Sequence, residues 1–301
     1  MSSPRRPFRF GVVTAMARSG EEWAARARRI ESLGYSTLVM PDGLRHTLSP
    51  LPALAAAAVA TTGLRVGTYV AANDYRNPVV LAKEAATVDF LSGGRLELGL
   101  GAGRSAAAED NRMMGVPFDT AGVRIARLEE ALVLIKALLG GEEASAEGGH
   151  YAASEAQISP GALQRPRPPI LVAGWSRRIL SLAAREADIV ALGGAPTTPE
   201  GPFADRVGWL REEAGDRFDE IELNVNLMAV GDQIPRWISH QMGLSAAELS
   251  ASGSFVALAG TLDGMCDELQ SRRERLGISY VMVSDELMEA LAPVVERLAG
   301  R

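Results

Sequence analysis

The regular alternation of two kinds of segment is the feature that most constrains the fold of this chain. In the first hundred residues, four short apolar segments are typical of buried β-strands: 8–14, 36–42, 64–71 and 95–101. Between them lie segments with apolar residues at helical spacing and a glycine at or beside the end: 20–35, 49–63 and 77–94. Such alternation predicts βαβ units with a parallel sheet. A doubly wound open sheet and a closed barrel both fit it.

The second half of the chain favours the barrel. Four more strand candidates occur, at 169–174, 188–194, 221–230 and 278–284. Helical segments are expected at 121–141, 176–187, 200–215, 261–277 and 286–299. Of two insertions, the one at 142–169 is too polar and Pro-rich for regular structure, and the other covers 231–260. Eight strands followed by helices predict one (β/α)8 TIM barrel domain over 1–301, with insertions after strands four and seven.

Composition excludes several classes of protein. The net charge is −6 and no basic stripe carries interleaved aromatics, so a nucleic-acid partner is not expected. The single Cys266 excludes a disulfide framework, and His150 and His240 have no metal-ligand partners at suitable spacing, so we expect no metal. No apolar segment follows the N-terminal arginines, and the longest apolar run, 51–60, is too short for a membrane span. We therefore expect a soluble, cytoplasmic protein without a membrane partner.

The segment RLELGLGAGR (95–104) places Gly99, Gly101 and Gly103 at the end of the fourth strand. A dinucleotide-binding turn has the spacing G-x-G-x-x-G and follows the first strand, so that interpretation fails. In a barrel, the carboxyl ends of the strands carry the active site. Glycines there either let backbone N–H groups converge on an anion or allow close packing, and spacing alone leaves both open.

A second segment offers donors to an anion at the end of the fifth strand. It reads Ala173-Gly174-Trp175-Ser176 and leads directly into a helix, whose first N–H groups are free to bind a phosphate. Strands four and five are neighbours in a barrel. Both loops are therefore expected to bind one phosphate.

These segments resemble a known family, the luciferase-like flavin and deazaflavin oxidoreductases. The likeness is carried by LRVGTYVAANDYRNPVVLAKEAATVDFLSGGRLELGLGAGR (64–104), with PFDTAGVRIARLEEALVLIKALL (117–139), RPRPPILVAG (165–174) and ADIVALGG (187–194). Members have a (β/α)8 barrel that binds FMN or coenzyme F420 at its carboxyl-terminal mouth. The resemblance implies that the cofactor phosphate is held by Gly101, Ala102 and Gly103 and by Ala173, Gly174, Trp175 and Ser176.

The resemblance also bears on the cofactor and its ring. A length near 300 residues and the LELGLGAG core resemble the deazaflavin branch, which favours F420 over FMN. Members of that branch share a non-proline cis peptide that supports the ring, here aligned with Tyr69–Val70, although an ordinary trans strand end stays open. Asp42 matches a residue that contacts the ring.

Two positions depart from the family pattern. Gly43 replaces a histidine that serves as the base in deazaflavin dehydrogenases, and His46 lies three residues further on, either near the site or on a surface loop. Arg104 replaces the glutamate of the sugar-phosphate dehydrogenases and either meets an anionic group or is a solvated cation. The missing base argues against alcohol oxidation. Reduction of an activated double bond fits better, with a proton from water, Tyr75 or His46.

The resulting prediction is an F420H2-dependent reductase that transfers a hydride between the deazaflavin and an activated C=C or C=N bond. The substrate is expected to be a small or peptide-like metabolite of secondary metabolism, bound near Asp74 and Arg104. Two alternatives remain: an FMN-dependent two-component monooxygenase and a non-catalytic flavin-binding barrel. A homodimer is expected because oligomers are common in the family.

Overall fold

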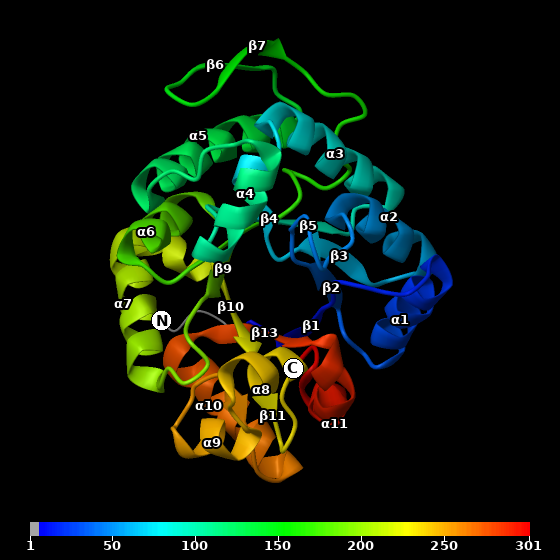
Figure 1. Cartoon of the computed structure of the whole chain (residues 1–301), viewed down its shortest axis with the longest axis vertical. Coiled ribbons are helices and arrows are strands. Elements are labelled where there is room, and N and C mark those ends of the chain that lie inside the picture. The colour runs from blue at the N-terminus through cyan, green and yellow to red at the C-terminus, as the bar shows by residue number, and fades with distance from the viewer. Residues whose placement is uncertain (1–5) are drawn as a thin grey trace. The chain divides into compact units, whose positions relative to one another are not determined.

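A computed structural model describes residues 6–301 (Figure 1). The strands are β1 (Arg9–Val13), β2 (Thr37–Met40), β3 (Arg65–Thr68), β4 (Ala71–Ala72), β5 (Leu96–Gly101), β6 (Ala144–Glu147), β7 (Ala152–Ala156), β8 (Ile170–Gly174), β9 (Ile189–Leu192), β10 (Glu222–Leu227), β11 (Ala229–Val230), β12 (Ala257–Leu258) and β13 (Ile278–Ser284). The α-helices are α1 (Gly20–Ser32), α2 (Pro50–Ala60), α3 (Pro78–Leu91), α4 (Ala108–Met114), α5 (Ala121–Gly140), α6 (Arg177–Glu186), α7 (Glu200–Ala214), α8 (Arg236–Met242), α9 (Ala246–Ala251), α10 (Leu262–Leu276) and α11 (Met288–Leu298). Four short 3-10 helices are η1 (Asn73–Tyr75), η2 (Ser105–Ala107), η3 (Gly215–Glu220) and η4 (Asp285–Leu287).

The chain divides into two compact units, which we describe separately. Unit 1 contains residues 6–14, 28–38 and 173–301, and unit 2 contains residues 15–27 and 39–172. In unit 1, β13 lies between β1 and β10 and runs parallel to both, with Phe10 opposite Val281 and Asn224 opposite Tyr280. Strand β10 also pairs in parallel with β9. Four parallel strands thus form the sheet of unit 1.

Unit 2 has a parallel sheet of the same kind. Strand β5 pairs with β3 and its short extension β4 on one side and with β8 on the other, where Leu98 lies opposite Ile170. The amide of Tyr69 donates to the carbonyl of Met40 at 2.6 Å, which joins the end of β3 to β2. Helix α3 packs against α2 and α5. The expected pairing of strands four and five, β5 and β8, is confirmed.

Eight parallel strands, each followed by a helix before the next, have the element order of a (β/α)8 barrel. Every residue of β2, β5 and β9 is buried, as expected for parallel strands covered on both faces. The helices begin where the sequence predicts: the Asn77 side chain accepts a hydrogen bond from the amide of Val79, and Pro78 opens α3. The single-domain expectation stays a prediction.

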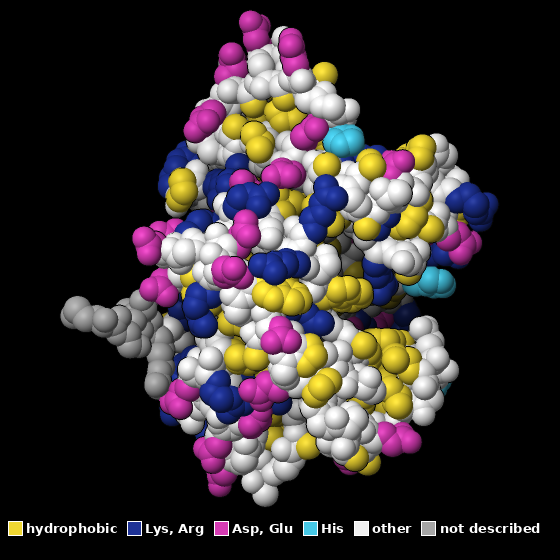
Figure 2. All heavy atoms as spheres, turned by 90° about the vertical axis from the view of Figure 1, so that its left-hand side faces the viewer, with side chains coloured by type: hydrophobic (Ala, Val, Ile, Leu, Met, Phe, Trp, Pro, Cys, Tyr) yellow, Lys and Arg dark blue, Asp and Glu magenta, His cyan; other side chains and the backbone are white. Residues whose placement is uncertain are grey.

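The insertion after β5 corrects one expectation. Residues 142–169 were expected to lack regular structure, but β6 and β7 form an antiparallel hairpin in which Ala146 lies opposite Ala153. The hairpin lies outside α5 and α3 in Figure 1. In the space-filling view its acidic side chains stand above a group of hydrophobic ones (Figure 2). Alanine, serine and glutamate are poor strand formers, which explains why the pattern gave no strand signal.

The second insertion has its own small core in unit 1. Ile238 of α8 and Leu249 of α9 are fully buried and pack together with Ala229, Ala246 and Ala257. Within residues 6–301, no helix has the length and apolar character that crossing a membrane requires.

Candidate active site

Two of the three glycines at the end of β5 are explained by packing. A Cβ on Gly99 would lie 2.0 Å from the backbone oxygen of Thr68, and a Cβ on Gly101 would lie 2.6 Å from Cγ2 of Val70. Neither distance is compatible with a side chain. Glycine at both positions therefore lets β5 lie close to the end of the third strand and its continuation.

Gly103 has a different reason to be glycine. It is exposed and has φ +78°, in the left-handed region that side chains disfavour. The loop around it is held from α5 by Arg124, whose Nε donates to the carbonyl of Ala102 at 2.9 Å and whose Nη2 donates to that of Gly103 at 3.3 Å. Arg124 is 8% exposed, and its guanidinium lies 4.0 Å from the ring centre of Phe118.

These bonds determine which way the loop presents its amides. In a trans peptide the N–H points opposite to the C=O of the preceding residue. Because Arg124 holds the carbonyls of Ala102 and Gly103, the N–H groups of Gly103 and Arg104 point away from α5. Among residues 6–301 these two N–H groups have no hydrogen-bond partner, and neither has the exposed guanidinium of Arg104. Consecutive free N–H groups at a strand end are a ready anion site.

The segment after β8, in unit 1, also combines packing with free donors. Gly174 has no room for a Cβ, which would lie 2.3 Å from Cγ2 of Ile179. Ser176 caps α6 through its backbone, and its hydroxyl has no partner in the described chain. Trp175 is 58% exposed and Ala173 is partly buried. Within residues 6–301, the first N–H groups of α6 have no backbone partner, as is usual at a helix start.

The cis peptide bond predicted at Tyr69–Val70 is present. Beyond it, the chain enters β4 and η1. These segments bind the side chain of Asp42, which follows β2. One oxygen of Asp42 accepts from Arg76 at 2.5 Å and from the amide of Ala72 at 3.1 Å, and the side chain is 3% exposed. Asp42 is therefore a buried, paired carboxylate that joins the end of β2 to η1.

Asp74 and Tyr75, in η1, are each bound to a different helix. Asp74 pairs with Arg127 of α5 at 2.7 Å, and its side chain is 7% exposed. Tyr75 donates from its hydroxyl to Oδ2 of Asp110, in α4, at 2.9 Å. The same oxygen accepts from the amide of Leu44 at 3.3 Å. One carboxylate thus joins α4, η1 and the loop after β2.

Comparison with known proteins identifies the family. A family model described as luciferase-like monooxygenase matches residues 7–242. The chain belongs to this family. The predicted resemblance is confirmed.

Proteins similar to the luciferase-like chain include two F420-dependent enzymes and a monooxygenase. An F420-dependent glucose-6-phosphate dehydrogenase of Nakamurella multipartita is 30% identical over 229 residues, 72% of this chain and 66% of that protein. The F420-dependent tetrahydromethanopterin reductase of Methanopyrus kandleri has a TM-score of 0.77 at 19% identity, over 97% of this chain and 99% of that one. A long-chain alkane monooxygenase has a TM-score of 0.77 at 15% identity, over 97% and 92%. These structures confirm the predicted (β/α)8 barrel.

In the luciferase-like chain, the loop after β2 departs from the family pattern at Gly43. His46 is exposed and has φ +64°. At Gly43, where the deazaflavin dehydrogenases of the family have histidine, a Cβ would lie 3.5 Å from Oδ2 of Asp110, an ordinary contact distance. Asp110 and Arg124 were not predicted from the sequence. The only sequence signal for these two residues was their position in α4 and α5, the helices that follow the glycine loop.

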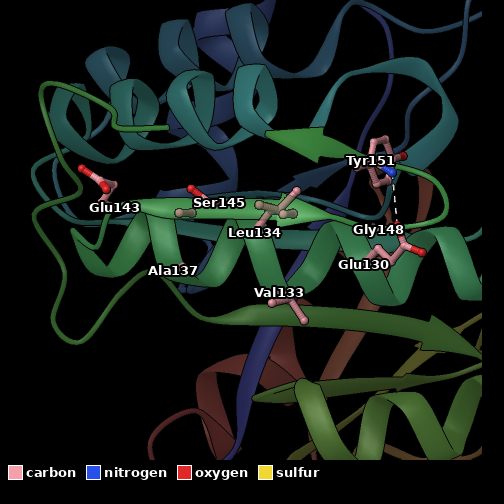
Figure 3. Close-up of a pocket in the computed structure, with 10 residues that line it drawn as sticks. Glu130, Val133, Leu134, Ala137, Glu143, Ser145, Gly148 and Tyr151 are labelled. Carbon is pink, nitrogen blue, oxygen red and sulfur yellow. Dashed lines mark hydrogen bonds between the residues drawn. The ribbon is translucent and has the colours of Figure 1, made fainter. Parts of the chain in front are cut away.

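A cavity beside α5 is separate from the predicted site residues. It has a volume of about 320 Å³ and lies between α5 and the hairpin, lined at one end by Glu130 and Tyr151 and at the other by Glu143 (Figure 3). The Glu130 carboxylate accepts from the amides of Gly149, His150 and Tyr151 at 3.2, 2.9 and 3.1 Å. This cavity is therefore part of the contact between α5 and the β6–β7 hairpin.

Proposed function

We propose that this chain is an F420H2-dependent reductase that transfers a hydride to an activated C=C or C=N bond of a small or peptide-like metabolite. Membership of the luciferase-like family and the F420-dependent relatives support an oxidoreductase with a deazaflavin or flavin cofactor. When bound, the reduced deazaflavin supplies a hydride and, unlike a flavin, reacts poorly with oxygen.

The observation that carries the proposal is the pair of free N–H groups at Gly103 and Arg104. Arg124 fixes the carbonyls of the same loop, so the donors are oriented before any ligand binds. Two amides and the Arg104 guanidinium match the non-bridging oxygens of a cofactor phosphate. By the resemblance, Gly101 and Ala102 belong to this site, and Ala173, Gly174, Trp175 and Ser176 serve the same cofactor.

The reductive direction is supported by the groups around the loop after β2. No histidine stands at position 43, and Asp42 and Asp74 are already paired with arginines. Both carboxylates are therefore engaged by arginine side chains within the protein. Tyr75 carries a proton that a reduced product needs. We assign Tyr75 to proton donation, with His46 as the second candidate, and Tyr69, Val70 and Asp42 to the ring.

The experiment that tests the proposal is turnover with reduced F420 and a panel of acceptors with activated C=C and C=N bonds. The expected result is oxidation of F420H2 that depends on an acceptor and proceeds at the same rate without oxygen. Oxidation of reduced FMN with incorporation of oxygen into the substrate would contradict it.

The FMN-dependent two-component monooxygenase is the second candidate, because the alkane monooxygenase shares the fold. It requires a partner that supplies reduced flavin and consumes oxygen in step with product. A third candidate, a non-catalytic flavin-binding barrel, predicts binding without turnover of any acceptor. The homodimer stays a prediction, to be tested by light scattering.

A further inference from the structure

We propose that Asp110 is a positioning residue that holds Tyr75 as the proton donor of the reaction, in place of the histidine missing at position 43. This inference rests on the proposed reductase activity and adds to it a residue and a source for the proton. It concerns residues of unit 2 only.

The geometry places the Asp110 carboxylate at a junction of three segments. Its Oδ2 accepts from the Tyr75 hydroxyl at 2.9 Å and from the Leu44 amide at 3.3 Å. Its Oδ1 lies 3.6 Å from Nε of Arg45, and the side chain is 12% exposed. Because the phenol proton points at Oδ2, the hydroxyl can rotate no further without losing this bond. Asp110 thus fixes both the phenol ring of Tyr75 and the loop after β2.

The Asp110 carboxylate also lies beside position 43, where the histidine side chain is missing. A Cβ built on Gly43 lies 3.5 Å from Oδ2 of Asp110. A side chain at position 43 would therefore begin in contact with this carboxylate. The polar group beside the loop after β2 is thus the Asp110 carboxylate, from α4. It holds the Tyr75 phenol, which is an acid, whereas the dehydrogenases have a histidine base in this loop.

The charges around Tyr75 keep it protonated. Burial raises the pKa of Tyr75 first, and the hydrogen bond to Asp110 and the charges of Asp110, Asp42 and Asp74 raise it further. Each of these carboxylates has its own cation: Arg45, Arg76 and Arg127 respectively. Burial alone would raise the pKa of Asp110, but the bonds from Tyr75 and Leu44, together with Arg45, outweigh it and lower that pKa. Near neutral pH the pair is a phenol beside a carboxylate.

The proton step follows from this arrangement. Hydride addition to one atom of the acceptor double bond leaves the π-electron pair on the other atom. The phenol proton of Tyr75 leaves its hydrogen bond to Asp110 and passes to that atom, so a new C–H or N–H bond forms as the O–H bond breaks. The tyrosinate then takes a proton from water, because Asp110 beside it disfavours the second negative charge. A carbanion or nitrogen anion is basic enough to remove this proton, and Tyr75 stays protonated until one is formed.

Three variants test the proposal: Tyr75→Phe, Asp110→Asn and Asp110→Glu, with Glu109→Gln as the control. Glu109 is the exposed neighbour of Asp110 in α4, and its partners are Arg45 and Arg112. The first readout is NMR of cofactor-free protein labelled with ¹³C at Cζ of its five tyrosines, with Tyr75→Phe assigning the signal. We expect Asp110→Asn to lower the pKa of Tyr75 by one unit or more and Glu109→Gln to leave it unchanged.

The second readout is turnover with F420H2, together with F420 affinity. We expect Tyr75→Phe and Asp110→Asn to lower kcat at least tenfold with F420 affinity within twofold of wild type. Asp110→Glu, which restores the carboxylate, is expected to recover part of kcat. In Asp110→Asn the alkaline limb of the kcat–pH profile moves to lower pH, since the phenol ionises earlier.

Contrary results separate the two claims. Normal F420 turnover with an unchanged Tyr75 titration in Asp110→Asn would overturn the role of Asp110. Wild-type kcat in Tyr75→Phe would overturn the donor. Absence of F420 binding in the wild type would overturn the proposed function, and the donor role with it, while a Tyr75 titration that still responds to Asp110→Asn would show that the pairing itself is real.

Discussion

At the scale of single residues, Arg124 is the side chain on which the phosphate assignment depends. Its guanidinium is buried, stacks on Phe118 and donates to the carbonyls of Ala102, Gly103 and Asp119. All of its bonds go to backbone oxygens, so it orients the loop and leaves the anion to the amides of Gly103 and Arg104. A planar guanidinium holds several acceptors at once, which a lysine ammonium on a flexible chain does not.

Arg124→Lys is therefore expected to weaken F420 binding at least tenfold. Affinity for the unphosphorylated ribityl form of the same deazaflavin should stay within twofold, because only the phosphate loop is disturbed. Fluorescence titration of both ligands measures this, and Arg112→Lys, on the exposed face of α4, is the matched control. Equal losses for the two ligands would place the effect elsewhere and remove the phosphate assignment.

Substitution of Gly99 tests whether close packing explains the glycines of β5. Gly99→Ala places a Cβ 2.0 Å from a backbone oxygen, so the strands must separate. We expect a loss of about 1–3 kcal/mol or more in the free energy of unfolding. The control is Gly140→Ala at the end of α5, where a Cβ meets nothing within 4 Å, and it should be neutral or stabilising by up to about 1 kcal/mol. Denaturant unfolding compares them, and equal stabilities would refute the packing explanation.

At the scale of elements, periodicity predicted the parallel strands and eight of the helices to within a few residues, because buried strands and amphipathic helices leave strong patterns. The short helices α4, α8 and α9 were not predicted. The β6–β7 hairpin left none, since Ala146 and Ala153 favour no strand and the hairpin depends on a tertiary contact. Its turn is held by the carboxylate of Glu130, from α5. Within the site, the glycine loop and Tyr75 were found from the sequence, whereas Asp110 and Arg124 act only through folded contacts.

The hairpin attachment should depend on pH. Hydrogen bonds from the amide of His150, and then those of Tyr151 and Gly149, lower the pKa of Glu130 below its usual value. A depressed pKa means that the attachment is fully present above the ordinary glutamate pKa of about 4.3 and is lost as pH falls through the lower, folded value.

Hydrogen exchange of the amides of 149–151, corrected for intrinsic pH dependence, measures this attachment. In the wild type, protection is expected at neutral pH and should disappear in acid below about pH 4. In Glu130→Gln, protection should already be weak at neutral pH and change little with acid. Full protection in the variant would show that the hairpin is held by other contacts.

At the scale of the whole molecule, the family and the fold agree with the element order, while the chemistry depends on a few side chains. The (β/α)8 barrel is shared by F420-dependent and oxygen-using enzymes, so the fold does not choose between them. Which of the two chemistries the protein performs depends on which cofactor it binds. The loop at Gly103 and Arg104 offers donors to a phosphate, and the loop at Gly43 lacks the dehydrogenase base.

The most direct test of the central claim is titration of the purified, cofactor-free protein with F420 and, separately, with FMN, followed by fluorescence. The account predicts micromolar binding of F420 and binding of FMN at least tenfold weaker. Preference for FMN would contradict it in favour of oxygen chemistry, and failure to bind either cofactor would contradict it in favour of a non-catalytic barrel.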